Sequence, residues 1–256
     1  MKKPLNYAPL SCRECANGTG LSFGFTMAFQ PIVDSVTKAI FAHEALVRGV
    51  NNEPAGDILS RVNIRNRYRF DQACRVKAIS LASALGLQNY LSINFLPRAI
   101  YRPETCIRTT LEAAQIYNFP VDRIIFEVSE GENVDDHAHI VSIFQEYKRL
   151  GFMTALDDFG AGYSGLNLLA EFQPDIIKLD MALIRGIHQH KVRRSIVVGI
   201  LAVCSEISSQ VIAEGIESQE EMLVLSDMGV HLFQGYYFAQ PAFQSLPALN
   251  PSAFVG

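Results

Sequence analysis

The sequence predicts an α/β fold, a TIM-like (β/α)8 barrel, and three observations support it. Short apolar runs recur along the chain, and most are followed by a stretch with helical periodicity. Such alternation of strands and helices is typical of a barrel. Most of the runs end in a carboxylate or an amide, the place where barrel strands carry functional groups. The length of 256 residues also suits this fold, which usually takes about 250.

The first two predicted strands depart from the ideal barrel. We expect them at residues 26–33 and 39–46, joined by the short segment 34–38. This connection has hairpin length and is too short for a parallel crossover, so the two strands should be antiparallel. The expected architecture is therefore a barrel with one antiparallel strand. Residues 1–25 have little periodicity and are predicted to be an N-terminal extension, with the barrel domain at 26–250.

The later elements follow from periodicity and from end signals. Further strands are predicted at 90–93, 123–126, 153–156, 177–180 and 210–213. Helices are predicted at 71–85, at 137–150 with Asp135 or Asp136 as its cap, and after the capping box that starts at Ser218. A glycine that can adopt the left-handed conformation follows each helix, at Gly86, Gly151 and Gly229. No repeat or linker divides the chain, which predicts one domain.

Composition excludes several classes of protein. Hydrophobic residues make up 49% of the chain, enough for a large core. The net charge of −4 gives no electrostatic footprint for a nucleic-acid duplex or an anionic membrane. No apolar run reaches the roughly 18 residues that span a bilayer, and no apolar segment of a signal peptide follows Lys2 and Lys3. We expect a cytoplasmic protein.

The five cysteines do not predict a disulfide framework, because their number is odd. Cys74, Cys106 and Cys204 fall singly in apolar segments and are expected to be buried. Cys12 and Cys15 form an isolated Cys-x-x-Cys pair. A zinc site would need two further ligands, and no second pair stands at a suitable spacing. A metal or redox role and an incidental role both stay open for this pair.

Oxygen ligands gather at the predicted strand ends, which is the strongest functional signal in the chain. They are Glu44, Asn94, Glu127, Asp157 with Asp158, Glu214 and Gln234. A ring of such oxygens on one rim suits a hard divalent cation. Adjacent side chains of a strand alternate, but at a strand end Asp158 can turn into the loop, so both aspartates can bridge two cations. Lys178 can hold an anionic oxygen or pair with Asp180. The sequence therefore predicts a metal-dependent enzyme.

With these motifs in view, the chain resembles the EAL family of cyclic di-GMP phosphodiesterases. The resemblance runs from about Met27 to Pro241 and includes Gln30-Pro31-Ile32, Glu44-Ala45-Leu46 and the segment from Asp157 to Ser164. It implies a barrel with one antiparallel strand and an active site that binds two Mg²⁺ or Mn²⁺ ions. The implied reaction cuts one phosphodiester bond of cyclic di-GMP to give linear pGpG.

The resemblance also implies a role for each matching residue. The implied ligands are Glu44, Asn94, Glu127 and Asp157 for the first metal, and Asp157 and Asp158 for the second. The implied catalytic residues are Glu214 as general base, Lys178 as the group that positions water, and Glu217 and Gln234 as residues that steady metals and water. Glu130 matches a glutamate that anchors the loop 158–164. Glu217 can also simply favour the start of the next helix through the helix dipole.

Substrate contacts are implied for Arg48, which matches an arginine that grips a phosphate, and for Gln30 and Leu46. Tyr236 is a candidate for stacking on guanine, as are its two neighbours, Tyr237 and Phe238, although wall packing is an equal alternative for two of the three. The chain departs from the family at Gly49, at Gly165 and over 50–70, where Arg61, Arg65, Arg67 and Arg69 replace a proline-rich stretch.

Two further expectations come from the resemblance. One is a homodimer formed through the helices next to the loop 158–164. The other is a choice between an enzyme and a catalytically silent sensor or protein-docking module that binds cyclic di-GMP. Silent members usually lack a metal ligand, and this chain has the complete set, so we expect the enzyme. Another phosphodiester substrate stays open, because the guanine contacts are not readable from the sequence.

Overall fold

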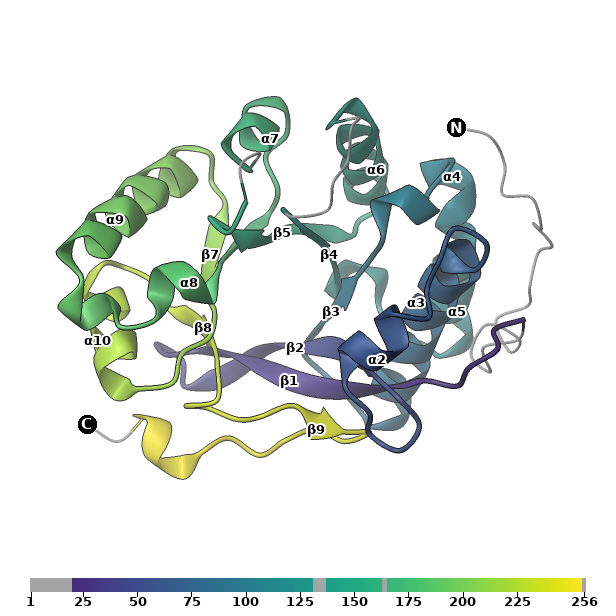
Figure 1. The fold of residues 1–256 in the computed structure, drawn as a ribbon, viewed down its shortest axis with the longest axis horizontal. Helices are drawn as coiled ribbons and strands as arrows, with labels where there is room; N and C mark the ends of the chain where they lie inside the picture. Colours follow the sequence, from purple (N-terminus) through teal and green to yellow (C-terminus); the bar gives the residue numbers. More distant parts are fainter. Residues whose placement is uncertain (1–19, 131–136, 163–164, 255–256) are drawn as a thin grey trace.

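One closed sheet forms the centre of the molecule. The computed structural model describes residues 20–130, 137–162 and 165–254, and Figure 1 shows its strands as a ring with helices around it. The strands are β1 (Thr26–Asp34), β2 (Ala39–Arg48), β3 (Tyr90–Asn94), β4 (Ile124–Ser129), β5 (Met153–Phe159), β6 (Ile176–Leu179), β7 (Gln210–Ala213), β8 (Leu232–Gln234) and β9 (Ala242–Phe243). The order β2 to β8, then β1, is closed by the pairing of β1 with β2.

The strand directions confirm the predicted barrel with one antiparallel strand. Neighbours from β2 to β8 run parallel, whereas β1 pairs antiparallel with both β2 and β8. The short β9 adds to β1 outside the ring. Every predicted strand is present, with ends shifted by at most three residues. The four-residue connection after β1 therefore makes the hairpin that the short predicted segment indicated.

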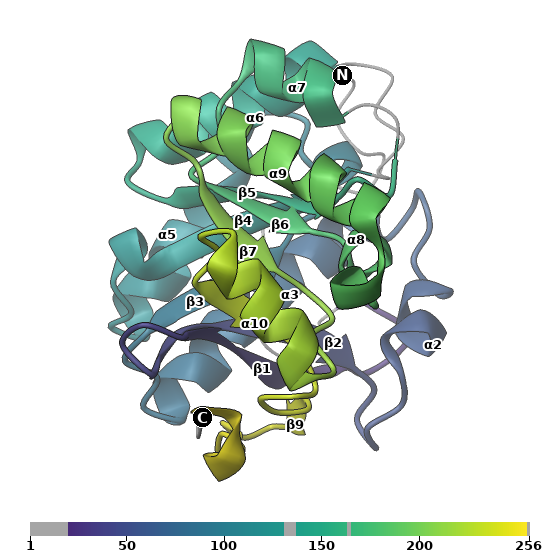
Figure 2. The ribbon, with the colours of Figure 1, turned by 90° about the vertical axis from the view of Figure 1, so that its left-hand side faces the viewer.

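The helices follow the strands around the barrel. They are α2 (Ala55–Leu59), α3 (Arg67–Ala84), α4 (Pro103–Cys106), α5 (Arg108–Ile116), α6 (His137–Arg149), α7 (Gly165–Glu171), α8 (Met181–Ile184), α9 (Lys191–Glu206) and α10 (Gln219–Asp227). Short 3-10 turns are η1 (Pro97–Ala99), η2 (Val121–Arg123), η3 (Ile187–Gln189) and η4 (Pro251–Phe254). Figures 1 and 2 together place α9 along the outside of β7. No helix in the described ranges is both long and apolar enough to cross a membrane.

The end signals in the sequence agree with the observed ends of the three predicted helices, with one exception. Ser218 and Glu221 form the predicted capping box of α10, and Gly86, Gly151 and Gly229 all have positive φ after a helix. The exception is α3, which begins at Arg67, four residues before the predicted start. Its first turn carries two arginines, so no apolar periodicity is visible there. The helix forms nevertheless, because Phe70 at the end of that turn is buried in the core.

Two apolar layers support the site. The inner layer fills the barrel and consists of Ile32, Ala42, Ile125, Ala155, Ile176, Ile212 and Leu232. The larger outer layer lies between the strands and the helices. Side chains alternate along a strand, so the residue two places beyond an inner-layer residue also faces inward. In β2 and β4 to β8 that residue is Glu44, Glu127, Asp157, Lys178, Glu214 or Gln234.

Some predictions fall outside the described residues. These are the caps Asp135 and Asp136, the pair Cys12 and Cys15, and most of the predicted extension 1–25, so the domain division stays a prediction. The other three cysteines, Cys74, Cys106 and Cys204, are free and buried, as predicted.

His43 is buried on the outer face of the barrel, next to the inward-facing Glu44. Its side chain is 2% exposed, and neither ring nitrogen has a hydrogen-bond partner in the described part of the chain. Burial lowers the pKa of His43 to about 4. The imidazole is therefore neutral in the folded protein at neutral pH.

We predict that His43 makes the protein acid-sensitive. Between pH 6.5 and 4 the unfolded chain protonates this histidine and the folded chain does not, so stability falls as the pH falls. Urea unfolding of metal-free protein at pH 7 and pH 4.5 should show that wild type loses about 2–3 kcal/mol more than His43→Leu. An equal loss in both proteins would show that this histidine does not set the acid response.

Candidate active site

A lysine lies at the centre of an acidic ring at the C-terminal end of the barrel. Lys178 of β6 is 0% exposed, and its ammonium group contacts four carboxylates. The distances from Nζ are 2.8 Å to Glu214, 3.0 Å to Glu127, 3.1 Å to Asp157 and 3.4 Å to Glu44. The barrel topology thus brings residues from four other strands onto one cation.

Burial and crowding shift the pKa of several groups in this ring. The pKa of Glu127 is raised to about 8, chiefly by burial; Lys178 lowers this pKa, and the charges of Glu44 and Asp157 raise it. The pKa of Glu214 is raised well above its ordinary value for the same reasons. Burial alone would lower the pKa of Lys178, but the carboxylates around it raise this pKa well above its usual range. The ring therefore attracts positive charge, either as protons or as cations.

A local irregularity of β5 brings two adjacent carboxylates to the same rim. The register of β5 against β6 shifts between Leu156 and Phe159, and Asp158 has a φ of 55°. The backbone N–H of Asp158 donates to Oδ1 of Asp157 at 2.9 Å, and Ser129 Oγ donates to Asp158 Oδ2 at 2.7 Å. In a regular strand these two aspartates would face opposite ways. The bulge places both carboxylates at the same end of the barrel.

The carboxylates form two groups that share one member. Glu44, Glu127 and Asp157 make the first group, and Asp157, Asp158 and Glu214 make the second. Within each group the oxygen atoms lie within 4.8 Å of one another, close enough to hold one metal ion. Their oxygen donors suit hard cations such as Mg²⁺ and Mn²⁺. With all five carboxylates of the two groups ionised, Lys178 would offset one of the five negative charges, and two divalent cations would carry the charge that balances the other four.

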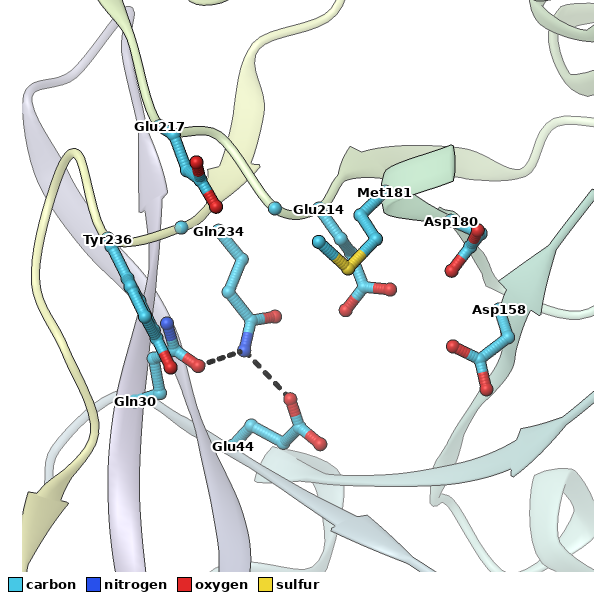
Figure 3. A pocket seen from close by; sticks show the side chains of 11 residues that line it. Gln30, Glu44, Asp158, Asp180, Met181, Glu214, Glu217, Gln234 and Tyr236 are labelled. Carbon is cyan, nitrogen blue, oxygen red and sulfur yellow. Dashed lines mark hydrogen bonds between the residues drawn. The ribbon is translucent and has the colours of Figure 1, made fainter. Parts of the chain in front are cut away.

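Amide side chains fix the position of Glu44. Asn94 Nδ2 donates to Glu44 Oε1 at 2.7 Å, and Gln234 Nε2 donates to Glu44 Oε2 at 2.8 Å. Gln234 also donates to Gln30 Oε1 at 3.3 Å, as Figure 3 shows. These contacts leave the amide oxygen of Asn94 available next to the first carboxylate group. Two of the predicted site residues thus hold Glu44 directly, and Gln30 accepts a hydrogen bond from one of them.

A pocket of about 280 Å³ opens above the ring. Its lining includes Gln30, Glu44, Asp158, Asp180, Met181, Glu214, Glu217, Gln234 and Tyr236, and Figure 3 shows the carboxylates of Glu44 and Glu214 directed into it. Asp180 caps α8, since its Oδ1 accepts from the N–H of Ala182 at 2.8 Å. The alternative of an ion pair between Lys178 and Asp180 is therefore wrong: Lys178 contacts the carboxylate ring instead.

The predicted substrate residues are more dispersed than the predicted ligands. Tyr236 is exposed at the wall of the pocket. Leu46 lines a separate apolar pocket of about 230 Å³ that also contacts Asn94. The guanidinium of Arg48 donates to the carbonyl of Val47 at 2.7 Å. Phe238 is fully buried, so wall packing is the correct alternative for this ring.

Glu217 lies at the edge of the pocket, where it forms an ion pair with Arg185. Both side chains are about half exposed, and neither contacts the buried carboxylates. Two hydroxyl groups that the sequence analysis did not name contact the ring directly: Ser92 donates to Glu127, and Ser129 donates to Asp158. Ser92 stands two residues before Asn94. Because alternate side chains of a strand face the same side, the position of Asn94 could have indicated that Ser92 also faces the site.

Glu130 holds the loop that follows β5. Its Oε2 accepts from the N–H groups of Gly160 at 2.8 Å and Gly162 at 3.2 Å, and its Oε1 accepts from Gly165 at 2.7 Å. A Cβ atom at Gly165 would lie 2.7 Å from the Phe159 ring, so the close approach requires glycine there. One carboxylate therefore satisfies three backbone donors beside Asp158.

We predict that Glu130→Gln loosens this loop. The amide keeps only one acceptor oxygen, so at least one partly buried N–H loses its partner, at a cost of about 1–3 kcal/mol. Urea unfolding should show this loss, and limited proteolysis should show faster cleavage near residue 160. Glu146→Gln, which breaks the exposed pair with Arg149, is the control and should change little. Unchanged stability and cleavage in Glu130→Gln would contradict the anchoring role.

Comparisons with known proteins identify the family. The model of the EAL domain matches residues 21–241. Among solved structures, a standalone EAL protein from Vibrio cholerae O395 with bound c-di-GMP is 60% identical, with a TM-score of 0.89, over 91% of this chain and 99% of that one. Two curated relatives come from Escherichia coli K12. The antirepressor BluF is 31% identical over 87% of this chain, and the cyclic di-GMP phosphodiesterase PdeR is 36% identical over 61%.

The match covers only part of these two relatives, since the chain spans 55% of BluF and 23% of PdeR. The family model, in contrast, covers nearly all of the barrel, from before β1 to the segment that leads into β9. The barrel with an antiparallel β1 and the carboxylate ring at its C-terminal end agree with this match. The chain therefore belongs to the EAL domain family.

Proposed function

We propose that this chain is a two-metal phosphodiesterase that hydrolyses cyclic di-GMP to linear pGpG. The observation that carries the proposal is the pair of carboxylate groups that share Asp157 around the buried Lys178. The complete ligand set favours an enzyme over a silent sensor. Two relatives add support, because PdeR is a cyclic di-GMP phosphodiesterase and the Vibrio cholerae protein has c-di-GMP bound.

Two Mg²⁺ or Mn²⁺ ions are the proposed cofactors. Glu44, Asn94, Glu127 and Asp157 would hold the first ion, and Asp157 and Asp158 would hold the second. Bound divalent cations neutralise a phosphodiester and lower the pKa of the attacking water. Asp157 belongs to both carboxylate groups, which supports the proposal of two neighbouring ions.

The remaining residues of the ring supply proton transfer and orientation. Glu214 is the proposed general base that accepts a proton from the attacking water, and cations bound beside it would keep its carboxylate ionised for this step. The ammonium of Lys178, 2.8 Å from Glu214, orients that water and stabilises negative charge on the phosphate oxygens. Gln234 keeps Glu44 in place through its 2.8 Å hydrogen bond, and Glu217 at the pocket edge is assigned a supporting role.

The substrate contacts are also proposals. Gln30 and Tyr236 line the pocket above the ring, and Tyr236 offers an exposed ring on which a guanine can stack. Leu46 offers apolar contact from the neighbouring pocket. Arg48 would leave the carbonyl of Val47 to reach a substrate phosphate, a rotation that costs one partly buried hydrogen bond.

The proposed enzyme acts as a homodimer. The resemblance suggests the helices next to the loop 158–164 as its interface, whereas the surface proposed here is helix α9. Val192, Ile196 and Val203 are exposed and follow one another at helical spacing, with Gly199 between them. This stripe is apolar along one face of the helix, which is unusual for a surface in contact with water. A second copy that packs its own α9 stripe against this one would bury both.

We predict that Ile196→Glu turns the dimer into a monomer, because two buried carboxylates would face each other across the interface. Val198→Glu is the control, since Val198 is exposed on another face of the same helix. Sedimentation velocity at several concentrations should show a monomer for the first variant and a dimer for the second. A wild-type monomer at every concentration would refute the dimer.

We predict that the purified chain converts cyclic di-GMP to pGpG with Mg²⁺ or Mn²⁺, and that EDTA stops the reaction. Glu44→Gln removes a charged ligand at constant shape and should lower turnover at least roughly 100-fold without unfolding the barrel. Chromatography of the nucleotides measures both, with Glu146→Gln as the control. A folded Glu44→Gln protein with the wild-type rate would count against the proposal. Tight binding of intact cyclic di-GMP by wild type, without product, would favour the sensor.

A further inference from the structure

A second cluster of buried charge lies on the outer side of β3 and β4, away from the pocket. Arg75 of α3 is 0% exposed, and its guanidinium contacts Asp71 Oδ2 at 2.9 Å. It also donates to the hydroxyl of Tyr147 on α6 at 2.7 Å. Burial opposes the charge on Arg75, but Asp71 and Tyr147 raise its pKa, so the guanidinium stays charged. A cation is thus held inside the apolar layer between two helices and the barrel.

The guanidinium packs against the aromatic neighbours of two proposed metal ligands. It lies 5.5 Å from the ring centroid of Phe95 and 4.9 Å from that of Phe126. Phe95 directly follows Asn94, and Phe126 directly precedes Glu127. Because side chains of a strand alternate, the rings of Phe95 and Phe126 face outward and the adjacent side chains, Asn94 and Glu127, face the site. The position of Arg75 therefore affects the backbone that carries Asn94 and Glu127.

Hydrogen bonds connect the cluster to the same backbone. Asp71 Oδ1 accepts from the N–H of Leu96 at 2.9 Å, two residues after Asn94. The N–H of Phe95 donates to the carbonyl of Glu127 at 3.0 Å, and Asn94 and Glu127 are register partners of β3 and β4. The chain that carries Asn94 is thus held by Asp71 on one side and by Glu127 on the other.

We infer that Asp71, Arg75 and Tyr147 are positioning residues that hold Asn94 and Glu127 in place for the first metal ion. This inference rests on the proposed two-metal function. Apolar packing could supply stability at this place equally well, because replacing a buried ion pair with apolar residues is often neutral or stabilising. The charged cluster adds orientation, because hydrogen bonds between a planar guanidinium and a carboxylate constrain the angles between the two groups as well as the distance between them.

The geometry gives the inference a selective consequence. The first carboxylate group includes Glu127, whose backbone carbonyl accepts from Phe95, a residue whose ring packs against Arg75, whereas the second group consists of Asp157, Asp158 and Glu214. Within the described ranges, Asp71, Arg75 and Tyr147 make no hydrogen bond or ion pair with that second group. Disturbing the cluster should therefore weaken the first ion and leave the second ion unchanged.

Two mild substitutions test this. Tyr147→Phe removes only the hydroxyl that contacts Arg75, and Asp71→Asn keeps an oxygen for Leu96 but removes the charge. Each protein is titrated with Mn²⁺ and the binding is monitored by calorimetry, which gives the affinity for each ion. Electron paramagnetic resonance then shows whether the bound ions form a pair. Two ions about 3.5–4 Å apart give a coupled spectrum, whereas a lone ion gives an isolated-ion spectrum. In both variants the affinity for one ion should fall about 10-fold, and isolated-ion signal should appear where wild type shows the pair.

Val197→Ala is the matched control, because it removes buried volume from α9 on the opposite side of the barrel. It should lower the unfolding free energy and leave both Mn²⁺ affinities at the wild-type value. If wild type binds no Mn²⁺ pair, the proposed function fails and this inference fails with it. If wild type binds the pair, two results would overturn the positioning role alone. One is that both variants bind both ions with wild-type affinity, and the other is that the affinities for both ions fall equally.

Discussion

The buried ammonium of Lys178 is the contact on which the site depends. Four carboxylates from four different strands meet around it, and each would repel the others if the lysine were absent. Removing one partner from such a cluster leaves buried charge uncompensated, which costs several kcal/mol. The lysine offsets only part of the negative charge, and the remainder is the charge of two divalent cations. Lys178 therefore lowers the repulsion between the carboxylates in the metal-free barrel. The negative charge that it does not offset makes the rim a candidate cation site.

The barrel supplies this arrangement through a simple repeat. In β2 and from β4 to β8, each strand places one apolar residue in the inner layer, and a polar residue follows two positions later at the rim. Only β5 breaks the repeat, where the bulge and the positive φ of Asp158 add a second carboxylate beside Asp157. An aspartate tolerates that conformation better than most residues, and Glu130 with the glycines after it holds the loop. The irregular backbone at the end of β5 thus adds the carboxylate that a second ion would need at this rim.

Much of this could be predicted from sequence, because period and end signals are local. The barrel and the convergence of Glu44, Glu127 and Asp157 follow from where polar residues end apolar runs. The antiparallel strand follows from the short connection between the first two strands. Contacts made by long or uncharged side chains could not be predicted in this way. Arg48 bonds to its own neighbour, and the hydroxyl of Ser92, which contacts Glu127, carries no charge to mark it. Such contacts depend on which rotamer the folded neighbours allow.

The carboxylate ring, and not the pocket walls, is the origin of the proposed chemistry. Anomalous diffraction from crystals grown with Mn²⁺ and cyclic di-GMP tests this most directly, because it locates metal without assumptions about turnover. We expect two peaks about 3.5–4 Å apart, one bounded by Glu44, Glu127 and Asp157 and one by Asp157 and Asp158, with a substrate phosphate between them. Peaks elsewhere, or nucleotide bound over a ring that holds no metal, would contradict the account.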